Sequence, residues 1–334
     1  MTRKVTIVGS GVMGLSIAHE LAVARDGNRG NEVVDVTVVA ERDAVQSVSG
    51  VAAAIWFPYQ SGESPSLADW LSRSRERFEA LAAEVPTAGV DLREGTVVER
   101  AAGADRWWTV AVTRWREAAP AELPAGAVAG VRAVVPVITM QYYLAWLRRR
   151  CADLGVTFVE AAVTSIDDVA RETGADTVVV AAGIGSGPLL GDDSMFPARG
   201  QVVRLANPRS GTGAHLADWI TDDDHPEGIT YIVPRRDDIV CGGVFEPGSW
   251  DTEISPETEA AILRRATSLV PELAGLPIVS RAAGLRPARK ALRLEHVPGY
   301  AVPVVACYGH GGAGVTLSWG CAEAVAELVR ETGD

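Results

Sequence analysis

The sequence predicts an α/β protein in which a parallel-sheet domain is joined to a second domain with a mixed-sheet α+β fold. Three observations predict this class. A strand, a glycine-rich turn and a helix follow one another within residues 5–24, and the same order returns within residues 302–329. Between them, short apolar runs broken by Gly and Pro alternate with helical stretches. The length of 334 residues also suggests more than one core.

The N-terminal unit has a βαβ pattern. An apolar run at residues 5–8 leads through GSGVMG into residues 15–24, whose apolar side chains recur at three- and four-residue spacing. The run VVDVTVVAE at residues 33–41 predicts the second strand. Residues 49–60, SGVAAAIWFPYQ, fit neither a periodic helix nor an alternating strand. We expect this segment to pass close to a ligand.

The middle of the chain is predicted to contain helices and strands that belong to two different domains. Helices are expected at residues 66–85, at 140–155 and from 256 onward, and strands at 156–161, 177–186, 201–205, 228–234 and 238–245, with a β-rich stretch over 91–135. The order of these elements predicts a discontinuous first domain. It comprises residues 1–60, 136–195 and 280–334, and the second domain comprises residues 61–135 and 196–279.

Composition excludes several classes of protein. Apolar residues make up 47% of the chain and charged residues 22%, but no apolar run is long enough to span a bilayer. A net charge of −12 disfavours nucleic acid as a partner. The four cysteines stand far apart without metal-ligand spacing, so we expect buried free thiols and no metal site. The first residues resemble a strand rather than a signal peptide, which predicts an intracellular protein.

Gly9, Gly11 and Gly14 form GxGxxG between a predicted strand and a predicted helix. In this context the pattern indicates a Rossmann-like dinucleotide site, in which a pyrophosphate approaches the helix N-terminus. A plain turn is the alternative. Glu41 closes the second strand, where a carboxylate accepts hydrogen bonds from a ribose and disfavours NADP. This unit alone does not separate NAD from FAD.

The C-terminal GHGGAGVTLSWG favours FAD. A second glycine loop that opens a helix offers backbone N–H groups to an electron-rich group such as the N1–O2 edge of a reduced flavin. An NAD domain has no such need. The alternative is a helix N-terminus that only packs against the sheet.

Four stretches resemble the D-amino-acid oxidase family in order and spacing. They are VAAAIWFPY, ARGQVVRL, TYIVP followed by GGVFEPGSW, and GLRPARKALRLE followed by YGHGGAGVTLSWG. The resemblance implies a Rossmann-like FAD-binding domain plus a mixed-sheet α+β substrate domain, with FAD held non-covalently. It also implies a reaction in which a hydride passes from the α-carbon of a D-amino acid to flavin N5 and oxygen reoxidises the flavin. The products are a 2-oxo acid, ammonia and hydrogen peroxide.

The resemblance also implies residue roles. Arg286 clamps the substrate carboxylate, for which its planar fork suits better than Lys, and the Tyr231 hydroxyl binds the same carboxylate. The carbonyl of Gly312 accepts a hydrogen bond from the substrate amine, and Ile55 and Tyr59 match the pocket wall beside the flavin. The positions that match cofactor contacts are Gly9, Gly11, Val12, Met13, Gly14, Glu41, Arg42, Ala53, Ala54, Val163, Gly311, Gly312, Gly314, Val315 and Thr316.

Structural explanations compete with these roles. Without the resemblance, Arg286 is equally well a surface ion-pair partner, and Tyr231 in an apolar strand is more often core. His310 stands between glycines, but the chemistry of the family needs no histidine base, so a structural role is favoured. No other acid, base or nucleophile constellation is visible. This fits a reaction that depends on alignment of the substrate.

The substrate-binding segments also depart from the family. The loop before TYIVP is short and carries no lid tyrosine, which predicts an open entrance. Related D-aspartate oxidases place arginines where this sequence has Asp224 and Phe245. A carboxylate at Asp224 would repel an acidic side chain, whereas Ile55 and Phe57 supply apolar wall. We therefore expect neutral or basic D-amino acids to be preferred over D-aspartate.

Several alternatives stay open. A glycine or sarcosine oxidase shares the cofactor domain, a D-aspartate oxidase shares the short loop, an NAD-dependent dehydrogenase would be colourless, and a binding protein would not need Arg286 with Tyr231. The C-terminal VRETGD lacks a peroxisomal address of the Ser-Lys-Leu type, and the composition favours a bacterial cytoplasm. The sequence does not determine the oligomeric state, for which a homodimer is the candidate.

Overall fold

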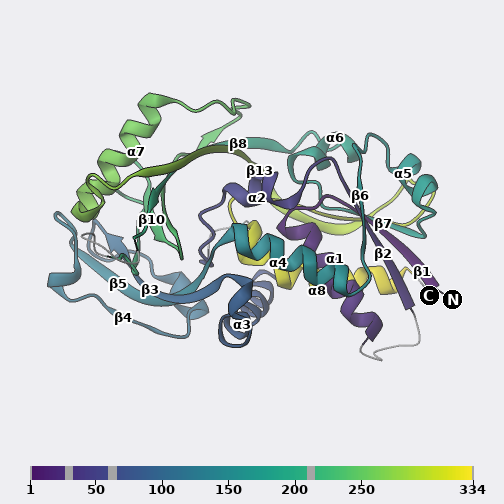
Figure 1. The fold of residues 1–334 in the computed structure, drawn as a ribbon, viewed down its shortest axis with the longest axis horizontal. Helices are drawn as coiled ribbons and strands as arrows, with labels where there is room; N and C mark the ends of the chain where they lie inside the picture. The colour runs from purple at the N-terminus through teal and green to yellow at the C-terminus, as the bar shows by residue number, and fades with distance from the viewer. Residues whose placement is uncertain (1, 27–32, 59–65, 209–214, 333–334) are drawn as a thin grey trace.

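One continuous sheet runs through the molecule. The structure is a computed structural model that describes residues 2–26, 33–58, 66–208 and 215–332. Its 14-stranded sheet has the order β4-β5-β3-β9-β10-β11-β8-β13-β14-β7-β1-β2-β6, with β12 paired to β8. Figure 1 shows α7 and the antiparallel strands at one end, and α1, α4, α8 and the parallel strands at the other end, where both termini lie.

The elements have the following bounds. The strands are β1 (Thr2–Val8), β2 (Val33–Ala40), β3 (Val90–Glu99), β4 (Trp115–Glu117), β5 (Ala129–Ile138), β6 (Thr157–Glu160), β7 (Thr177–Val180), β8 (Phe196–Ala206), β9 (Trp219–Asp222), β10 (Thr230–Pro234), β11 (Asp238–Gly242), β12 (Glu246–Pro247), β13 (Ile278–Val297) and β14 (Val304–His310). The α-helices are α1 (Val12–Asp26), α2 (Val48–Val51), α3 (Leu67–Glu84), α4 (Met140–Asp153), α5 (Ile166–Thr173), α6 (Ser186–Leu190), α7 (Pro256–Leu269) and α8 (Gly314–Glu331). The 3-10 helices are η1 (Ala44–Gln46), η2 (Pro86–Ala88), η3 (Trp107–Ala111), η4 (Pro120–Glu122), η5 (Gly183–Gly185) and η6 (Pro271–Leu273).

The parallel part of the sheet confirms the βαβ prediction. Strand β1 pairs in parallel with β2 and with β7. Strand β7 also pairs in parallel with β14, and β2 with β6. All four residues of β7, TVVV, are buried, as expected for a strand covered on both faces. The predicted helices at 66–85, at 140–155 and from 256 are also confirmed, as α3, α4 and α7.

Strand β13 joins the two parts of the sheet, and the sequence did not predict it. Its first part, Ile278–Ala288, pairs with β8, and its second part, Arg293–Val297, pairs with β14. A bulge separates them. Most of its side chains are half-buried, so the strand shows no alternation of apolar and polar residues. The division into two domains therefore stays a prediction within one sheet.

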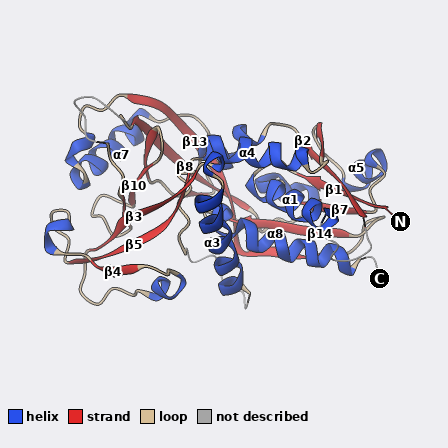
Figure 2. Cartoon of the chain, turned by 60° about the horizontal axis from the view of Figure 1, so that its bottom comes forward, coloured by secondary structure: helices blue, strands red, loops and turns tan. Residues whose placement is uncertain are grey.

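The helices α1, α3, α4 and α8 pack together over the largest hydrophobic core. Figure 2 shows α3 between the two ends of the molecule, with α8 beside α1. A Cβ at Gly320 in α8 would lie 2.4 Å from the Cα of Trp70 in α3, so this close crossing requires glycine. Helix α7 packs on β8, β10 and β11 over a second core, and α5 covers a third core on the parallel strands.

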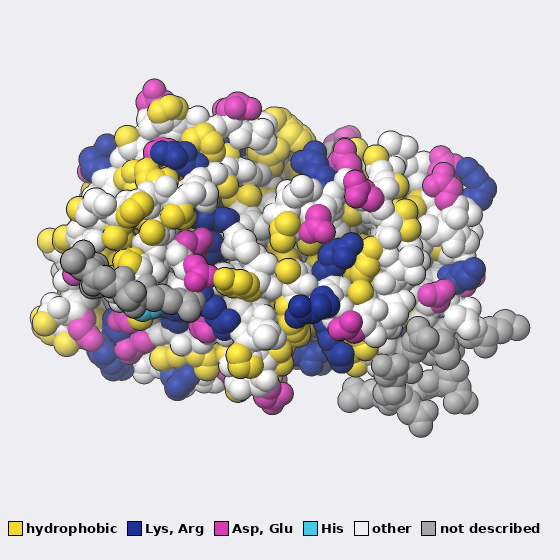
Figure 3. Space-filling view, in the orientation of Figure 1, with side chains coloured by type: hydrophobic (Ala, Val, Ile, Leu, Met, Phe, Trp, Pro, Cys, Tyr) yellow, Lys and Arg dark blue, Asp and Glu magenta, His cyan; other side chains and the backbone are white. Residues whose placement is uncertain are grey.

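Two further predictions concern the described residues. All four cysteines, Cys151, Cys241, Cys307 and Cys321, are buried and free, which confirms the expectation of unbridged thiols. None of the helices described is both long and apolar enough to cross a membrane. Acidic and basic side chains are interspersed over the face in Figure 3.

Candidate active site

Arg286 and Tyr231 come together from different strands. Arg286 lies in β13 opposite Ala198 of β8, and its Nη1 donates to the carbonyls of Val244, at 2.9 Å, and Arg199, at 3.3 Å. Tyr231 lies in β10 between β9 and β11. Burial raises the pKa of the Tyr231 hydroxyl, and the nearby Arg286 guanidinium opposes that rise through its charge and a hydrogen bond. The hydroxyl is therefore held neutral beside a fixed cation.

Three glycines make room for these two side chains. A Cβ at Gly200 would lie 2.4 Å from Nη1 of Arg286. A Cβ at Gly242 would lie 2.2 Å from the Tyr231 ring, and one at Gly243 would lie 2.5 Å from it. Sequence reasoning missed these positions. Their signal was the glycines themselves within the strand-like stretches ARGQVVRL and DIVCGGVF, where glycine marks a close approach.

The C-terminal glycine loop reaches the same place. A Cβ at Gly312 would lie 3.9 Å from Cδ of Arg286. Gly311 has a φ of +55° and donates its N–H to the carbonyl of Pro287 at 2.8 Å. The structure therefore brings Arg286, Tyr231 and Gly312 together, as their expected roles require, although β10, β13 and this loop are far apart in the sequence.

Beside the loop, a buried carboxylate ties β13 to β14. Asp192 accepts hydrogen bonds from Ser194 Oγ at 2.5 Å, Tyr308 Oη at 2.9 Å and Arg289 Nε at 3.1 Å. Burial alone would raise its pKa, but the hydrogen bonds of Ser194 and Tyr308 and the charge of Arg289 outweigh burial and lower the pKa of Asp192 to about 2. The carboxylate is therefore charged at neutral pH and holds the strands that carry Arg286 and the glycine loop.

The first glycine loop has the geometry of a dinucleotide turn. Gly9 has a φ of +114°, and a Cβ there would lie 2.4 Å from the carbonyl oxygen of Ala181. A Cβ at Gly14 would lie 1.9 Å from the carbonyl oxygen of Gly9. The side chains of Val12 and Met13 are buried in the core, so these residues can present only their backbone to a ligand. These close approaches place the start of α1 against the loop, as an anion site requires.

The other positions expected around the adenosine lie at the carboxyl ends of the strands. Glu41 and Arg42 directly follow β2, with their side chains exposed by 66% and 68%. Both are therefore accessible to a ligand. Val163 follows β6 and packs on the core under α5. Because β2 and β6 are paired in parallel, the three positions lie at the same edge of the sheet.

The start of α8 offers unpaired donors. Its N-cap residue, Ala313, makes no side-chain hydrogen bond, and Leu317 is the first residue whose N–H bonds back, to the carbonyl of Ala313 at 3.0 Å. The N–H groups of Gly314, Val315 and Thr316 therefore have no intrahelical partner. In the described part of the chain, His310 Nε2 is buried without a hydrogen-bond partner. This donor set fits a bound electron-rich group, as expected for a flavin edge.

The segment after α2 is held against β5. The N–H of Ile138 donates to the carbonyl of Ala54 and the N–H of Trp56 donates to the carbonyl of Pro136, both at 2.8 Å. Ile55 is half-buried between these two bonds. The residues expected at the flavin, Ala53 and Ala54, precede it, whereas Tyr59 lies outside the described residues. Phe57 packs on Trp108, with ring centroids 4.9 Å apart, and on Trp219.

The two residues that govern the expected substrate preference are both exposed. Phe245 is 54% exposed and directly follows Val244, whose carbonyl accepts from Arg286. Asp224 lies in the turn after β9. Phe245 is thus next to the carboxylate clamp, whereas nothing in the described contacts ties Asp224 to it.

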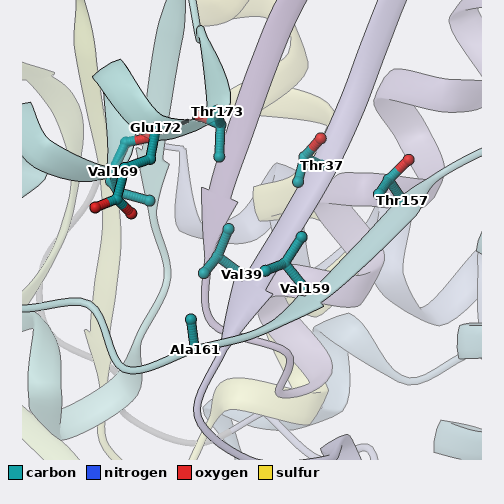
Figure 4. Close-up of a pocket in the computed structure, with 8 residues that line it drawn as sticks. All are labelled: Thr37, Val39, Thr157, Val159, Ala161, Val169, Glu172 and Thr173. Atoms are coloured by element: carbon teal, nitrogen blue, oxygen red, sulfur yellow. Dashed lines mark hydrogen bonds between the residues drawn. The ribbon is translucent and has the colours of Figure 1, made fainter.

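A cavity of about 260 Å³ lies elsewhere, between α5 and the face of β2 and β6. Figure 4 shows its lining, with Thr37, Val39, Thr157 and Val159 on the strands and Glu172 and Thr173 on the helix. None of the residues expected to bind substrate or cofactor lines this cavity. This cavity is therefore separate from the candidate site around Arg286.

Comparison with known proteins shows the family to which the chain belongs. A family model described as FAD dependent oxidoreductase matches residues 4–328. The chain belongs to this family. A D-amino-acid oxidase from Rubrobacter xylanophilus is 43% identical over 97% of this chain and 95% of its own length, and one from Streptomyces coelicolor is 37% identical over 97% and 96%. Family membership makes the protein a flavoenzyme with FAD as its cofactor, which confirms the choice of FAD over NAD.

Solved structures confirm the fold class. The glycine oxidase from Geobacillus kaustophilus has a TM-score of 0.81 at 22% identity and covers 99% of this chain and 95% of its own. The glycine oxidase from Bacillus cereus has a TM-score of 0.78 at 20% identity, covering 98% and 95%. At these identities the likeness concerns the fold alone. The sequence relatives at 43% and 37% identity fit the D-amino-acid oxidase prediction better than the glycine oxidase alternative.

Proposed function

We propose that this protein is a D-amino-acid oxidase that converts neutral or basic D-amino acids to 2-oxo acids, ammonia and hydrogen peroxide. The observation that carries the proposal is that Arg286, Tyr231 and Gly312 come together. Glycines leave the space that the Arg286 and Tyr231 side chains occupy. A lone surface arginine would not need Gly200 beneath its guanidinium. The two D-amino-acid oxidases named above support the same reaction class.

Binding of the substrate carboxylate is assigned to Arg286 and Tyr231. The guanidinium gives a planar pair of donors, and because one Nη already donates to two carbonyls, the group is fixed before substrate arrives. The neutral Tyr231 hydroxyl adds a third donor. Fixing the carboxylate at two points removes most of the rotational freedom of a small amino acid, which is the largest catalytic contribution available here.

The Gly312 carbonyl would orient the substrate amine, and thereby the α-hydrogen. FAD, when bound, accepts a hydride from the α-carbon and is reoxidised by oxygen. The donors at the start of α8, the first glycine loop and Glu41 would hold the cofactor, together with Arg42, Val163 and the segment Ala53–Ile55. None of these contacts calls for a covalent bond to FAD. The role of the chain is to bind and align the substrate and the cofactor and to exclude competing orientations of the substrate.

Substrate preference follows from the residues beside the clamp. Phe245 directly follows Val244 beside the clamp, and Ile55 and Phe57 supply apolar wall; the proposal further places the exposed Asp224 carboxylate at the entrance, although no described contact ties Asp224 to the clamp. This combination favours neutral or basic side chains over D-Asp and D-Glu. Glycine or sarcosine oxidation is the second candidate, because two glycine oxidases share the fold.

A substrate panel tests the proposal. The purified protein should show flavin absorption bands, and heat or acid should release the flavin. Peroxide release should be faster with D-Met and D-Arg than with D-Asp, glycine or sarcosine. Higher kcat/KM for glycine than for every D-amino acid would contradict the proposal. A bacterial cytoplasmic location and a homodimeric assembly complete the proposal; light scattering on a size-exclusion column measures the assembly.

A further inference from the structure

Two arginines contact the backbone of the segment that follows α2. Arg204 of β8 donates from Nη2 to the carbonyl of Gly50 at 2.6 Å. Arg235, which follows β10 and is fully buried, donates from Nη1 to the carbonyl of Ala52 at 3.4 Å. The two guanidiniums thus bind the carbonyls of two residues, Gly50 and Ala52, in one short stretch of chain.

The two arginines differ in whether a carboxylate compensates their positive charge. Arg235 pairs with both oxygens of Asp238, at 2.7 and 2.6 Å, so its charge is compensated. Arg204 forms no ion pair with a carboxylate of the described residues. With the Gln141 side-chain amide turned so that its oxygen faces the guanidinium, that oxygen accepts from Arg204 Nη1 at 2.5 Å and Nη2 at 3.1 Å. Burial lowers the pKa of Arg204, and the charge of Arg235 lowers it further. A half-buried cation held by neutral oxygens is partly desolvated without a compensating charge, a cost that an apolar side chain would not have.

The contacted stretch is strained and anchored at every second residue. Hydrogen bonds hold the carbonyls of Gly50, Ala52 and Ala54 and the N–H of Trp56. Ala54 has a φ of +59°, and among the described residues it is the one non-glycine with a positive φ. Such a conformation persists where the surroundings over-determine it. The N–H groups of Ala53 and Ala54 have no hydrogen-bond partner within the described chain.

The start of the stretch also lies beside the first glycine loop and beside strand β13. The N–H of Val12 in the first glycine loop donates to Ser49 Oγ at 3.1 Å. A Cβ at Gly284, two residues before Arg286, would lie 3.1 Å from Val48. Its unpaired N–H groups therefore belong to a segment that bridges the dinucleotide turn and the strand that carries the substrate clamp.

We propose that Arg204 and Arg235 are positioning residues for the cofactor: by fixing the carbonyls of Gly50 and Ala52 they impose the strained turn at Ala54 and aim the N–H groups of Ala53 and Ala54 at the flavin. This inference rests on the proposed placement of FAD beside these residues. Its physical basis is preorganisation, because donors fixed in advance lose little entropy when the ligand binds.

The test uses Arg204→Met, which keeps an unbranched apolar stem and removes the donors, and Arg204→Lys, which keeps the charge but replaces the planar guanidinium by a single ammonium group. Arg235→Lys keeps the ion pair with Asp238 and shortens the reach to Ala52. Arg281→Met is the matched control, since Arg281 lies in β13 and pairs with Glu259 at the surface. Apoprotein of each variant is titrated with FAD, following the quenching of flavin fluorescence, and the thermal midpoint of each apoprotein is measured.

We expect Arg204→Met to raise the FAD Kd by about tenfold or more, the loss of roughly one strong buried hydrogen bond. Its apoprotein midpoint should stay within about 4 °C of the wild type, because removal of the half-buried, unpaired cation offsets the lost bond. Arg204→Lys and Arg235→Lys should raise the Kd less, and the bound flavin of these variants should show a shifted or less resolved visible band. Arg281→Met should leave the Kd unchanged.

Unchanged FAD affinity in Arg204→Met and Arg235→Lys would overturn the inference. So would a fall in the apoprotein midpoint with no change in Kd, which marks a purely structural role. If Arg204→Met does not fold, the two Lys variants decide the question by the same criterion. Failure of the wild type to bind FAD would instead remove the proposed function on which the inference rests.

Discussion

The guanidinium of Arg286 occupies the space that a side chain at residue 200 would fill. A Cβ at Gly200 would lie 2.4 Å from Nη1 and 2.6 Å from Cζ of Arg286. Residues 200 and 284 are paired across β8 and β13, so Arg286 folds back along its own strand over this position. Arg286 can take this direction because Gly200, on the neighbouring strand, has no side chain. This relationship can be tested.

Gly200→Ala should displace Arg286 without disturbing the cofactor. The methyl group cannot be accommodated at 2.4 Å, so the guanidinium must move or β8 must shift. We expect KM for D-Met to rise by about tenfold or more, with the flavin spectrum retained. Steady-state kinetics by peroxide release measure this. Wild-type KM in Gly200→Ala would show that Arg286 does not bind substrate from its present position.

Arg286→Lys should reduce kcat/KM for D-Met by about 100-fold, because an ammonium keeps the charge but loses the planar fork. Arg286→Met should be worse, since it also leaves the carboxylate without a cation. The visible spectrum should persist in both variants. Kinetics like those of the wild type in either variant would assign the carboxylate clamp to another residue.

Tyr231→Phe should raise KM several-fold, the effect of losing one hydrogen bond to a charged group. Burial raises the pKa of the Tyr231 hydroxyl above its usual 10, so the group stays protonated and able to donate below that pH. We therefore expect no loss of wild-type substrate affinity from tyrosine ionisation up to about pH 10. A profile of kcat/KM against pH checks this, and a tyrosine-dependent fall near pH 8 or 9, absent in Tyr231→Phe, would contradict it.

The expected substrate preference depends on Asp224. Asp224→Asn should lower the ratio of kcat/KM for D-Arg over D-Met by less than about fivefold, because an exposed charge is screened by water and salt. In the wild type, D-Asp should be slower than both. Turnover of D-Asp faster than that of D-Arg and D-Met would overturn the proposed preference while leaving the oxidase proposal intact.

Acid stability should depend on Asp192. Its pKa is about 2 in the folded protein and near 3.8 without the fold, so its charged form contributes stability that is complete above about pH 4. That contribution, on the order of 1–2 kcal/mol, is lost as the pH falls through the folded pKa. Asp192→Asn should therefore lower the thermal midpoint at pH 7 and reduce its dependence on pH between 4 and 2. Parallel pH profiles for the variant and the wild type would contradict this role.

Local features of the site were predictable from the sequence. The first glycine loop, the helix that follows it and the acid Glu41 at the end of the second strand are encoded within 41 consecutive residues. Apolar periodicity and turn chemistry act between near neighbours, so α3, α4, α7 and the parallel strands could be predicted without knowledge of the fold. The roles of Arg286, Tyr231 and Gly312 came from a family resemblance, because spacing alone left Arg286 equally well a surface ion-pair partner and favoured a core position for Tyr231.

What the sequence determined by itself was therefore the class of the fold, the two glycine loops and the chemical types available for binding. The tertiary structure alone decided that Gly200 lies under Arg286, that Gly242 and Gly243 lie under Tyr231, and that β13 joins the two parts of the sheet. It also decided that Arg204 and Arg235 hold the strained segment at Ala54. These relationships join residues far apart in the sequence, such as Ala52 and Arg235, which are 183 positions apart. They arise from strand pairing and burial, which leave no periodic mark in the sequence.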